Sequence, residues 1–421
     1  MTMTRLAYNA LLWLLFPYVF FHLAWRARKQ PEYLQHVGER FGRYAAQSDK
    51  PVLWLHTVSV GETRAAATLV QRLRERYPDH QLLLTHTTPT GRAASEQLFG
   101  DDVLRVYLPY DYPFAVQRFL DHFKPRLGVL LETEVWFNLI DACRTGKVPL
   151  LLLNARLSPK SARNYSRVRT LARESLHALT LIAAQTEDDA LRLASLGHRA
   201  VPVMGNLKFE IVPPAHQLAL GAELRRQFGA QRPVLLAAST RDGEEELLLN
   251  ALKYAAVDHL LVVIVPRHPQ RFDAVAALIE QHGYSMQRRS GDEPIAAGTR
   301  VVLGDSMGEM FAYYAACDIA FIGGSLLPLG GQNLIEAAAC GKPVLLGPHT
   351  YNFAQAAEAA IAHGAGLRVQ HADDLVHLLN VLMYDPARMR AMGEAGRRFV
   401  EENQGATERA VCLIDTVLNK K

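Results

Sequence analysis

Three carboxylates in the first half of the chain stand where a side chain can take up a proton. Glu62 comes six residues after an apolar run, Val52–His56, and Gly61 leaves room before it. Glu132 and Glu134 directly follow a second apolar run. A carboxylate in such a place can deprotonate an attacking hydroxyl, orient a sugar or stabilise positive charge on it. Purely structural roles stay open for these residues. An acid in a first helical turn, such as Glu62, interacts favourably with the helix dipole, and acids in a loop, such as Glu132 and Glu134, are often simply exposed to solvent.

Three further features are suited to binding an anionic nucleotide. Lys208, in the motif Gly205–Phe209 (GNLKF), can face a phosphate or carboxylate as a point charge. Arg267 follows the apolar run Leu260–Val265, and an arginine can pair a phosphate through two hydrogen bonds. The backbone of Asp305–Glu309 (DSMGE) can line a nucleobase slot. The alternatives are a surface lysine and an ordinary helix cap, which are common roles for these residue types.

A glycine-rich segment, Phe321–Gly347 (FIGGSLLPLGGQNLIEAAACGKPVLLG), reads as strand, loop, helix and strand. Adjacent glycines let a backbone approach a ligand, and the start of a helix favours an anion. The segment therefore predicts a phosphate site, with Glu336 binding the hydroxyls of a ribose. Asn333 and Glu336 also have the spacing of a capping box, in which Glu336 only satisfies the start of the helix.

These residues need elements that bring them together, and the hydropathy pattern after residue 50 supplies them. Apolar runs alternate with segments of helical spacing, which predicts parallel sheets covered by helices on both faces. The expected strands are 52–56, 82–85, 127–131, 148–154, 181–184, 234–237, 260–265, 301–303, 319–322 and 344–346. Ligands bind beyond the carboxyl ends of strands in such sheets, and the candidates that follow strands fall on that edge.

The chain has 421 residues, more than one ordinary core holds, and adjacent prolines at 213 and 214 make a plausible linker. We therefore expect an α/β protein with two doubly wound domains facing a cleft. The expected parts are a membrane anchor helix at 1–30, a first Rossmann-like domain at 31–211, a second at 212–405, and a last helix at 406–421 that crosses back to the first domain.

The segment Leu6–Trp25 (LAYNALLWLLFPYVFFHLAW) is uncharged and long enough to cross a bilayer. By the positive-inside rule, the basic residues behind it place the rest of the chain in the cytoplasm. Those residues are Arg26, Arg28 and Lys29. Asn9, Pro17 and His22 weaken a spanning helix, so a helix lying on the membrane surface stays open.

The composition excludes several classes of protein. Hydrophobic residues make up 49% and charged residues 21%, as in a globular protein, and the four cysteines show no paired spacing that would suggest a zinc site. Seven basic and three acidic residues in the first fifty account for the whole net charge of +4, so no nucleic-acid-binding face is indicated. Motifs of nucleotide hydrolases, dehydrogenases, zinc proteases and serine esterases are absent from the sequence.

Seven motifs in order, with the apolar N-terminus, resemble the bacterial Kdo (3-deoxy-D-manno-octulosonic acid) transferases of lipopolysaccharide biosynthesis. The motifs are HTVSVGE (56–62), YLPYD (107–111), ETEVW (132–136), NARLS (154–158), GNLKF (205–209), VPRHP (265–269) and GGQNLIEAA (330–338). The resemblance implies a GT-B fold of two Rossmann-like domains. It also implies inverting, metal-independent transfer of Kdo from CMP-Kdo to a tetra-acylated lipid A precursor (lipid IVA) on the cytoplasmic face of the inner membrane, with no cofactor.

The same resemblance assigns roles to residues of this chain. Glu62 matches the general base, and Glu132 and Lys208 match residues that assist the transition state. The residues matching the CMP site are Pro266, Arg267, Met307, Gly308, Glu309, Asn333, Leu334, Ile335 and Glu336. Two positions depart from the family pattern: Gln332, often a histidine, and Phe137, where a proline is expected. Neither is a catalytic position.

Two other interpretations stay open. A different GT-B enzyme, such as a sugar-nucleotide epimerase or a UDP-sugar transferase, would share the fold, although the apolar N-terminus argues against an epimerase acting on a soluble substrate. A membrane-tethered binding or scaffold protein that has lost activity is disfavoured by the intact Glu62, Arg267 and Glu336.

Overall fold

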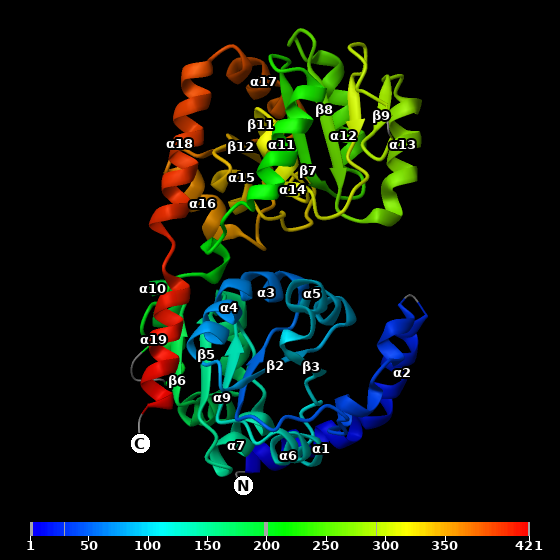
Figure 1. Ribbon diagram of the computed structural model, residues 1–421. Coiled ribbons are helices and arrows are strands. Elements are labelled where there is room, and N and C mark those ends of the chain that lie inside the picture. Colours follow the sequence, from blue (N-terminus) through cyan, green and yellow to red (C-terminus); the bar gives the residue numbers. More distant parts are fainter. Residues whose placement is uncertain (1–2, 29, 198–200, 292, 420–421) are drawn as a thin grey trace. The chain divides into compact units, whose positions relative to one another are not determined.

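The computed structural model describes residues 3–28, 30–197, 201–291 and 293–419. Lys29 of the basic flank, residues 1 and 2 of the expected anchor and residues 420 and 421 of the expected last helix lie outside that description. The chain forms two compact units (Figure 1). Unit 1 comprises residues 1–210 and 404–421, and unit 2 comprises residues 211–403.

Unit 1 is built on a six-stranded parallel sheet with strand order β3-β2-β1-β4-β5-β6. Its strands are β1 (Val52–His56), β2 (Gln81–His86), β3 (Leu104–Tyr107), β4 (Leu127–Leu131), β5 (Leu150–Ala155) and β6 (Leu181–Ala184). The chain direction across the sheet reverses between β1 and β4, and such a switch point is where doubly wound sheets bind ligands. Glu62 follows one of these two strands and Glu132 the other.

Helices cover both faces of this sheet because its strands are apolar on both faces. Along β1, Trp54 packs into one hydrophobic core and its neighbour Leu55 into the other. The helix α19 joins the second core through Ala410 and Ile414. The covering helices are α3 (Val60–Ala65), α4 (Ala67–Arg76), α5 (Pro89–Phe99), α6 (Pro113–Phe123), α7 (Phe137–Thr145), α8 (Pro159–Arg167), α9 (Arg169–Ala178), α10 (Glu187–Ser195) and α19 (Ala406–Leu418).

Unit 2 is built on a seven-stranded parallel sheet with strand order β13-β12-β11-β7-β8-β10-β9. Its strands are β7 (Val234–Thr240), β8 (Leu261–Pro266), β9 (Met286–Arg288), β10 (Val301–Leu303), β11 (Ile319–Ile322), β12 (Val344–Leu346) and β13 (Gly366–Arg368). Its helices are α11 (Ala215–Phe228), α12 (Glu244–Ala251), α13 (Phe272–Gln281), α14 (Met310–Ala316), α15 (Ile335–Ala339), α16 (Ala354–Ala362), α17 (Ala372–Met383) and α18 (Pro386–Glu402). The switch point lies between β7 and β11, so the glycine-rich loop after β11 stands at it.

All ten expected strands are confirmed, and the two parallel sheets with them. Three further strands were not predicted: β3, β9 and β13. Each is the last strand at an edge of its sheet, where one side lacks a neighbouring strand. Edge strands are short and carry charged residues, so they lack the continuous apolar run that marks a central strand.

The apolar N-terminal segment is not one helix. It forms α1 (Met3–Leu14) and α2 (Phe16–Ala27), and a bend of 49° separates them. Pro17 lies in the first turn of α2, where a helix tolerates a missing N–H. Because proline has no N–H to donate to the preceding turn, α1 does not continue through it. Within the described residues no single helix has the length and hydropathy to cross a bilayer, whereas the bent pair taken together meets both criteria.

Polar contacts hold α1 to the rest of unit 1. The Tyr8 hydroxyl donates to the buried Asp111 carboxylate over 2.9 Å, and Asn138 donates to the side chain of Asn9 over 2.7 Å. Arg5 forms an ion pair with Asp141. The side of α1 that faces the domain is therefore fixed by hydrogen bonds that a fully lipid-embedded helix would lack.

Candidate active site

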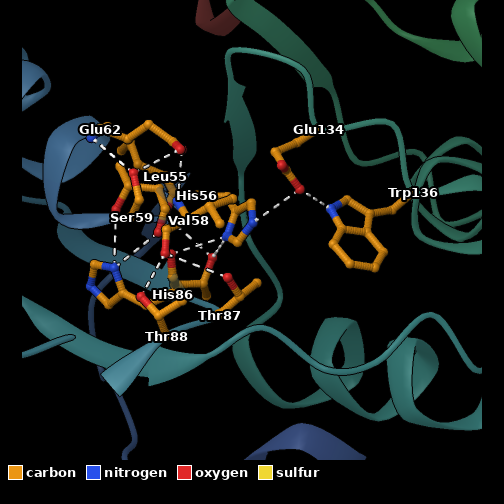
Figure 2. Close-up of polar contacts among 12 residues, drawn as sticks. Leu55, His56, Val58, Ser59, Glu62, His86, Thr87, Thr88, Glu134 and Trp136 are labelled. Carbon is orange, nitrogen blue, oxygen red and sulfur yellow. Dashed lines mark hydrogen bonds and ion pairs between the residues drawn. The ribbon is translucent and has the colours of Figure 1, made fainter. Parts of the chain in front are cut away.

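Glu62 lies in the first turn of α3, just beyond the carboxyl end of β1 (Figure 2). Its carboxylate accepts hydrogen bonds from the Val58 N–H over 2.8 Å and from the Ser59 hydroxyl over 3.0 Å. Ser59 in turn caps α3 by accepting from the Glu62 N–H. Glu62 therefore takes part in capping its helix, and as an acid in the first turn it also suits the helix dipole, which was the plainer alternative. The carboxylate is nevertheless half-buried at the predicted ligand edge.

The surroundings of Glu62 raise the pKa of its carboxyl. Burial raises the pKa of its carboxyl from the usual 4.5 to about 7, and the nearby negative charge of Glu132 also raises it. The hydrogen bonds from Val58 and Ser59 lower the pKa, but by less. A carboxyl that titrates near neutral pH can take up a proton from a substrate and release it again, which is the property that a general base needs.

Glu132 and Lys208 form an ion pair beside this carboxylate. The Lys208 Nζ lies 2.8 Å from the Glu132 Oε1, although the two residues are far apart in the sequence. Glu132 has a left-handed backbone with φ of 62°, which is uncommon for a residue with a side chain and is found most often at functional sites. Lys208 lies in the short helix η4 (Leu207–Phe209), whose first N–H donates to the Asn154 side chain over 3.1 Å. The structure thus gathers the three predicted catalytic residues.

Three residues beside this group were not predicted as site residues, namely His56, His86 and Trp136, whereas Glu134 was one of the carboxylates singled out from the sequence. His56, at the end of β1, is fully buried, and its Nε2 lies 3.7 Å from the Glu134 carboxylate, which also accepts from the Trp136 indole over 2.6 Å (Figure 2). His86, at the end of β2, is also buried, and burial lowers its pKa to about 3, so it is neutral. His56, Glu134 and Trp136 stand inside the motifs HTVSVGE and ETEVW, so the signal was present.

In unit 2, the predicted nucleotide residues lie at the carboxyl edge of the second sheet. Arg267 follows β8, and its backbone N–H donates to the Thr240 carbonyl over 3.0 Å. Both Arg267 and Glu336 act on the buried Tyr314: burial raises the pKa of that phenol, Glu336 raises it further and Arg267 lowers it. Arg267 and Glu336, predicted from separate motifs, therefore both lie near this phenol.

The remaining nucleotide residues stand on neighbouring loops of unit 2. Pro266 ends β8 and is buried, whereas the side chain of Met307 is 59% exposed. Gly308 has a left-handed φ of 81°, and the Glu309 that follows it lies 3.3 Å from Arg289. The turn before α14, formed by Met307, Gly308 and Glu309, is open, whereas Pro266 lies in the buried strand β8.

The glycine-rich loop differs from the expected phosphate cradle in its first half. The N–H groups of Gly324, Ser325 and Leu326 all donate to the carboxylate of Glu244, which is completely buried. The expectation that this part of the loop faces a ligand is therefore wrong, because a side chain of the protein already occupies it. Glu244 was not predicted from the sequence.

The second half of the glycine-rich segment retains the predicted arrangement. Asn333 accepts from the Ile335 N–H over 3.0 Å and donates to Glu336 over 3.1 Å. Leu334 and Ile335, buried in the core, begin α15. Asn333 thus satisfies the first N–H of α15, and its amide holds the Glu336 carboxylate at the start of the helix.

Comparisons with known proteins agree with this architecture. A family model described as 3-deoxy-D-manno-octulosonic-acid transferase (kdotransferase) matches residues 35–211, and one described as glycosyl transferases group 1 matches residues 247–399. A 3-deoxy-D-manno-octulosonic acid transferase of Bordetella pertussis is 45% identical over 89% of this chain and 90% of its own length. The Haemophilus influenzae protein of that name is 36% identical over 99% of this chain and 100% of its own length.

Solved structures show the same fold at low identity. A glycosyltransferase of Rickettsia africae superposes with a TM-score of 0.61 at 15% identity, covering 89% of this chain and 100% of the other. The Anabaena protein HepE, in complex with UDP, superposes with a TM-score of 0.58 at 18% identity, covering 87% of this chain and 99% of its own. These matches establish two Rossmann-like domains of the kind found in GT-B glycosyltransferases.

Proposed function

Because the chain belongs to the 3-deoxy-D-manno-octulosonic-acid (Kdo) transferase family, we propose that it transfers Kdo from CMP-Kdo to a tetra-acylated lipid A precursor, lipid IVA, in lipopolysaccharide biosynthesis. The observation that carries the proposal is the Glu62 carboxylate. It stands at the switch point of the unit 1 sheet with a pKa raised to about 7, beside the Glu132–Lys208 ion pair. A base, a second carboxylate and a cation in one place suit glycosyl transfer to a hydroxyl.

In the proposed reaction, Glu62 removes the proton from an acceptor sugar hydroxyl. The acceptor oxygen then attacks the anomeric carbon of Kdo from the face opposite the nucleotide. The bond from that carbon to the CMP phosphate breaks, and CMP leaves with the electron pair, so the configuration at the anomeric carbon inverts. Glu132 stabilises the positive charge that develops on the sugar, and Lys208 holds Glu132 in place at 2.8 Å.

The proposed CMP site consists of the unit 2 residues predicted above. Arg267 would pair the phosphate, and Glu336, held by Asn333, would accept from the ribose hydroxyls. The open turn Met307–Glu309 would lie against the base. No metal ion is part of this proposal, because the family resemblance implies a metal-independent transfer in which positive side chains and N–H groups match the charge on the leaving phosphate.

We place the protein on the cytoplasmic face of the inner membrane, with α1 and α2 lying on the surface. Large apolar side chains of both helices are exposed: Leu6, Leu11, Trp13, Leu14, Leu15, Tyr18, Phe20, Phe21 and Trp25. An exposed apolar surface of this extent is typical of a contact with lipid, and the polar contacts of α1 favour a surface position over a spanning one.

Vesicle flotation tests the membrane proposal. The double variant Leu14→Glu with Phe21→Glu changes side chains that are 77% and 75% exposed, so folding should be unaffected. Binding to vesicles containing anionic lipid should fall by about 10-fold or more, since each change removes an apolar contact and adds a charge. Leu191→Glu on α10, where the leucine is 68% exposed, is the matched control. Unchanged flotation of the double variant would contradict the proposal.

The activity is tested with purified protein, CMP-Kdo and the tetra-acylated acceptor. We expect CMP release together with an acceptor product heavier by one or more Kdo units, detected by mass spectrometry. Glu62→Gln should lower the rate by about 100-fold or more. Glu96→Gln, which changes an exposed glutamate on α5, is the control. Normal turnover by Glu62→Gln would refute the assignment of Glu62 as the base. Transfer from a UDP-sugar alone would refute CMP-Kdo as the donor.

A further inference from the structure

A buried arginine of unit 1 lacks the partner that its charge requires. Arg40, in the short helix η2 (Val37–Phe41), is only 3% exposed. Its Nη1 donates to the Thr87 carbonyl over 3.0 Å, and its guanidinium carbon lies 4.0 Å from the centre of the Tyr107 ring. Its Nε and Nη2 have no hydrogen-bond partner among the described residues. Burying a cation without an anion is costly, so this arrangement calls for a ligand.

The carboxylate of the adjacent residue, Glu39, is engaged by other groups. Glu39 accepts from the Arg92 Nη1 over 2.8 Å and from the Tyr107 N–H over 2.7 Å. Arg92 itself lies 5.2 Å from the centre of the Tyr107 ring, and Arg26 lies 5.1 Å from that of Tyr33. Three guanidinium groups thus surround these two tyrosines with one carboxylate among them. The site carries excess positive charge.

The arginine cluster lies on the same sheet edge as Glu62. Thr87, the partner of Arg40, directly follows β2, and both Thr87 and Thr88 donate to the Val58 carbonyl, over 3.4 and 3.1 Å. The N–H of the same Val58 donates to the Glu62 carboxylate. A short chain of hydrogen bonds through Thr87 and Val58 therefore joins Arg40 to the proposed base.

The other side of the cluster meets the apolar N-terminal helices. Phe41, next to Arg40, stacks on Phe20 of α2 with ring centres 5.4 Å apart, and Arg26 stands in the last turn of the same helix. The cluster is therefore bordered by an apolar surface on one side and by the edge that carries Glu62 on the other. A ligand that fills the cluster would place an anionic group among the arginines, a sugar at the edge that carries Glu62 and an apolar chain against α2.

We propose that Arg40, with Arg92 and Arg26, forms a subsite for a phosphate group of a phosphorylated glycolipid acceptor. The inference rests on the proposed function, because it places the acceptor sugar at Glu62 and its acyl chains on α2. A guanidinium can offer two parallel N–H groups to one phosphate, and Nε and Nη2 of Arg40 form such a pair. Because Nε and Nη2 are buried, binding requires neighbouring side chains to move, and the half-buried Tyr33 ring, 5.9 Å from the guanidinium carbon, is one of these neighbours.

Kinetics with two acceptors test the subsite: the phosphorylated glycolipid and the same glycolipid after removal of its phosphates. Arg40→Gln should raise KM for the phosphorylated acceptor by about 10- to 100-fold and leave KM for CMP-Kdo unchanged. The unmodified protein should use the dephosphorylated acceptor poorly, and Arg40→Gln should not change the KM for that acceptor. An equal loss with both acceptors, or a raised KM for CMP-Kdo, would overturn the proposal, the second outcome indicating that the donor carboxylate binds there.

Two exposed positions keep the test independent of folding. Arg26 is exposed, and Arg26→Gln should raise KM for the phosphorylated acceptor by a few-fold. Arg28, two residues further along the chain, is also exposed, and Arg28→Gln should leave this KM unchanged. Direct binding of the phosphorylated glycolipid in micelles, without donor, separates this inference from the proposed function. Arg40-dependent binding without any Kdo transfer would uphold the subsite and refute the transferase activity, and Arg40-independent binding would refute the subsite alone.

Discussion

The pH dependence of the reaction should shift in opposite directions when two neighbours of Glu62 are changed. Its pKa of about 7, against a usual 4.5, results from burial and the charge of Glu132, opposed by hydrogen bonds from Val58 and Ser59. The net difference of about 2.5 pH units corresponds to about 3 kcal/mol at about 1.4 kcal/mol per unit. Because the ionised carboxylate is the active form, kcat/KM should rise with pH through an acid limb near pH 7.

Ser59→Ala removes a donor that lies 3.0 Å from the carboxylate and stabilises its ionised form. A hydrogen bond to a charged group contributes about 1.5–3 kcal/mol, and water replaces part of it at a half-buried site, so the acid limb should move up by about one pH unit. Glu132→Gln removes the second-largest cause of the raised pKa and should move the limb down by about one unit or less, since burial remains. The plateau rates of both variants will also fall, but only the position of the limb is compared.

The assay is the initial rate at subsaturating substrate between about pH 5 and 9 in a buffer of constant ionic strength, with Glu96→Gln as the control. Opposite shifts would identify the titrating group as Glu62, because no other carboxyl of the site is bonded to Ser59 and also raised by Glu132. A limb that stays in place in both variants, or moves the same way in both, would show that another group titrates, and the assignment of Glu62 as the base would be refuted.

Two further predictions concern stability. Since the pKa of Glu62 is raised in the folded state, its ionisation costs stability as pH rises from about 4.5 to about 7, so Glu62→Gln should unfold at the same or a higher temperature at pH 8 while losing activity. The gain should be at most about 3 kcal/mol and should vanish below about pH 4.5, and a variant less stable than the parent at pH 8 would contradict it. Glu244→Ala leaves the N–H groups of Gly324, Ser325 and Leu326 without a partner, so the unfolding free energy should fall by at least about 3 kcal/mol in thermal or urea denaturation. A loss below about 1 kcal/mol would show that water replaces the carboxylate.

The central part of the fold could be predicted because central strands of a parallel sheet are apolar on both faces. Leu127–Leu131 was predicted with the bounds that the structure has, since Val129 and Leu130 pack into different cores and no polar residue interrupts the run. The edge strand Leu104–Tyr107 escaped prediction, because Arg105 interrupts its apolar pattern and only β2 pairs with it. Its existence depends on a neighbour that the local sequence does not specify.

The positions of Glu62 and Glu132 could be predicted because strand order follows a rule, and residues after parallel strands share one edge. The Glu132–Lys208 ion pair could not be predicted in the same way. It depends on Asn154, a residue with a left-handed φ of 53° whose side chain accepts from the Leu207 N–H and so fixes η4 at the edge of the sheet. Such a contact joins segments that no local pattern connects.

The glycine-rich loop shows why the sequence pattern of an anion site does not identify the anion. Consecutive N–H groups in a glycine turn bind a carboxylate as readily as a phosphate, because both present oxygen acceptors with negative charge. Glu244–Glu246 at the start of α12 would be expected to be solvated acids that suit the helix dipole, and two of the three are completely buried. The pairing of β11 with β7 brings Glu244 to the loop, and Arg271 neutralises its neighbour Glu245 at 2.7 and 2.9 Å. The protein thus uses its own carboxylate to hold the first half of the loop, which leaves the second half, with its Asn333–Glu336 contact, as the part of the glycine-rich segment that can serve the nucleotide site we propose.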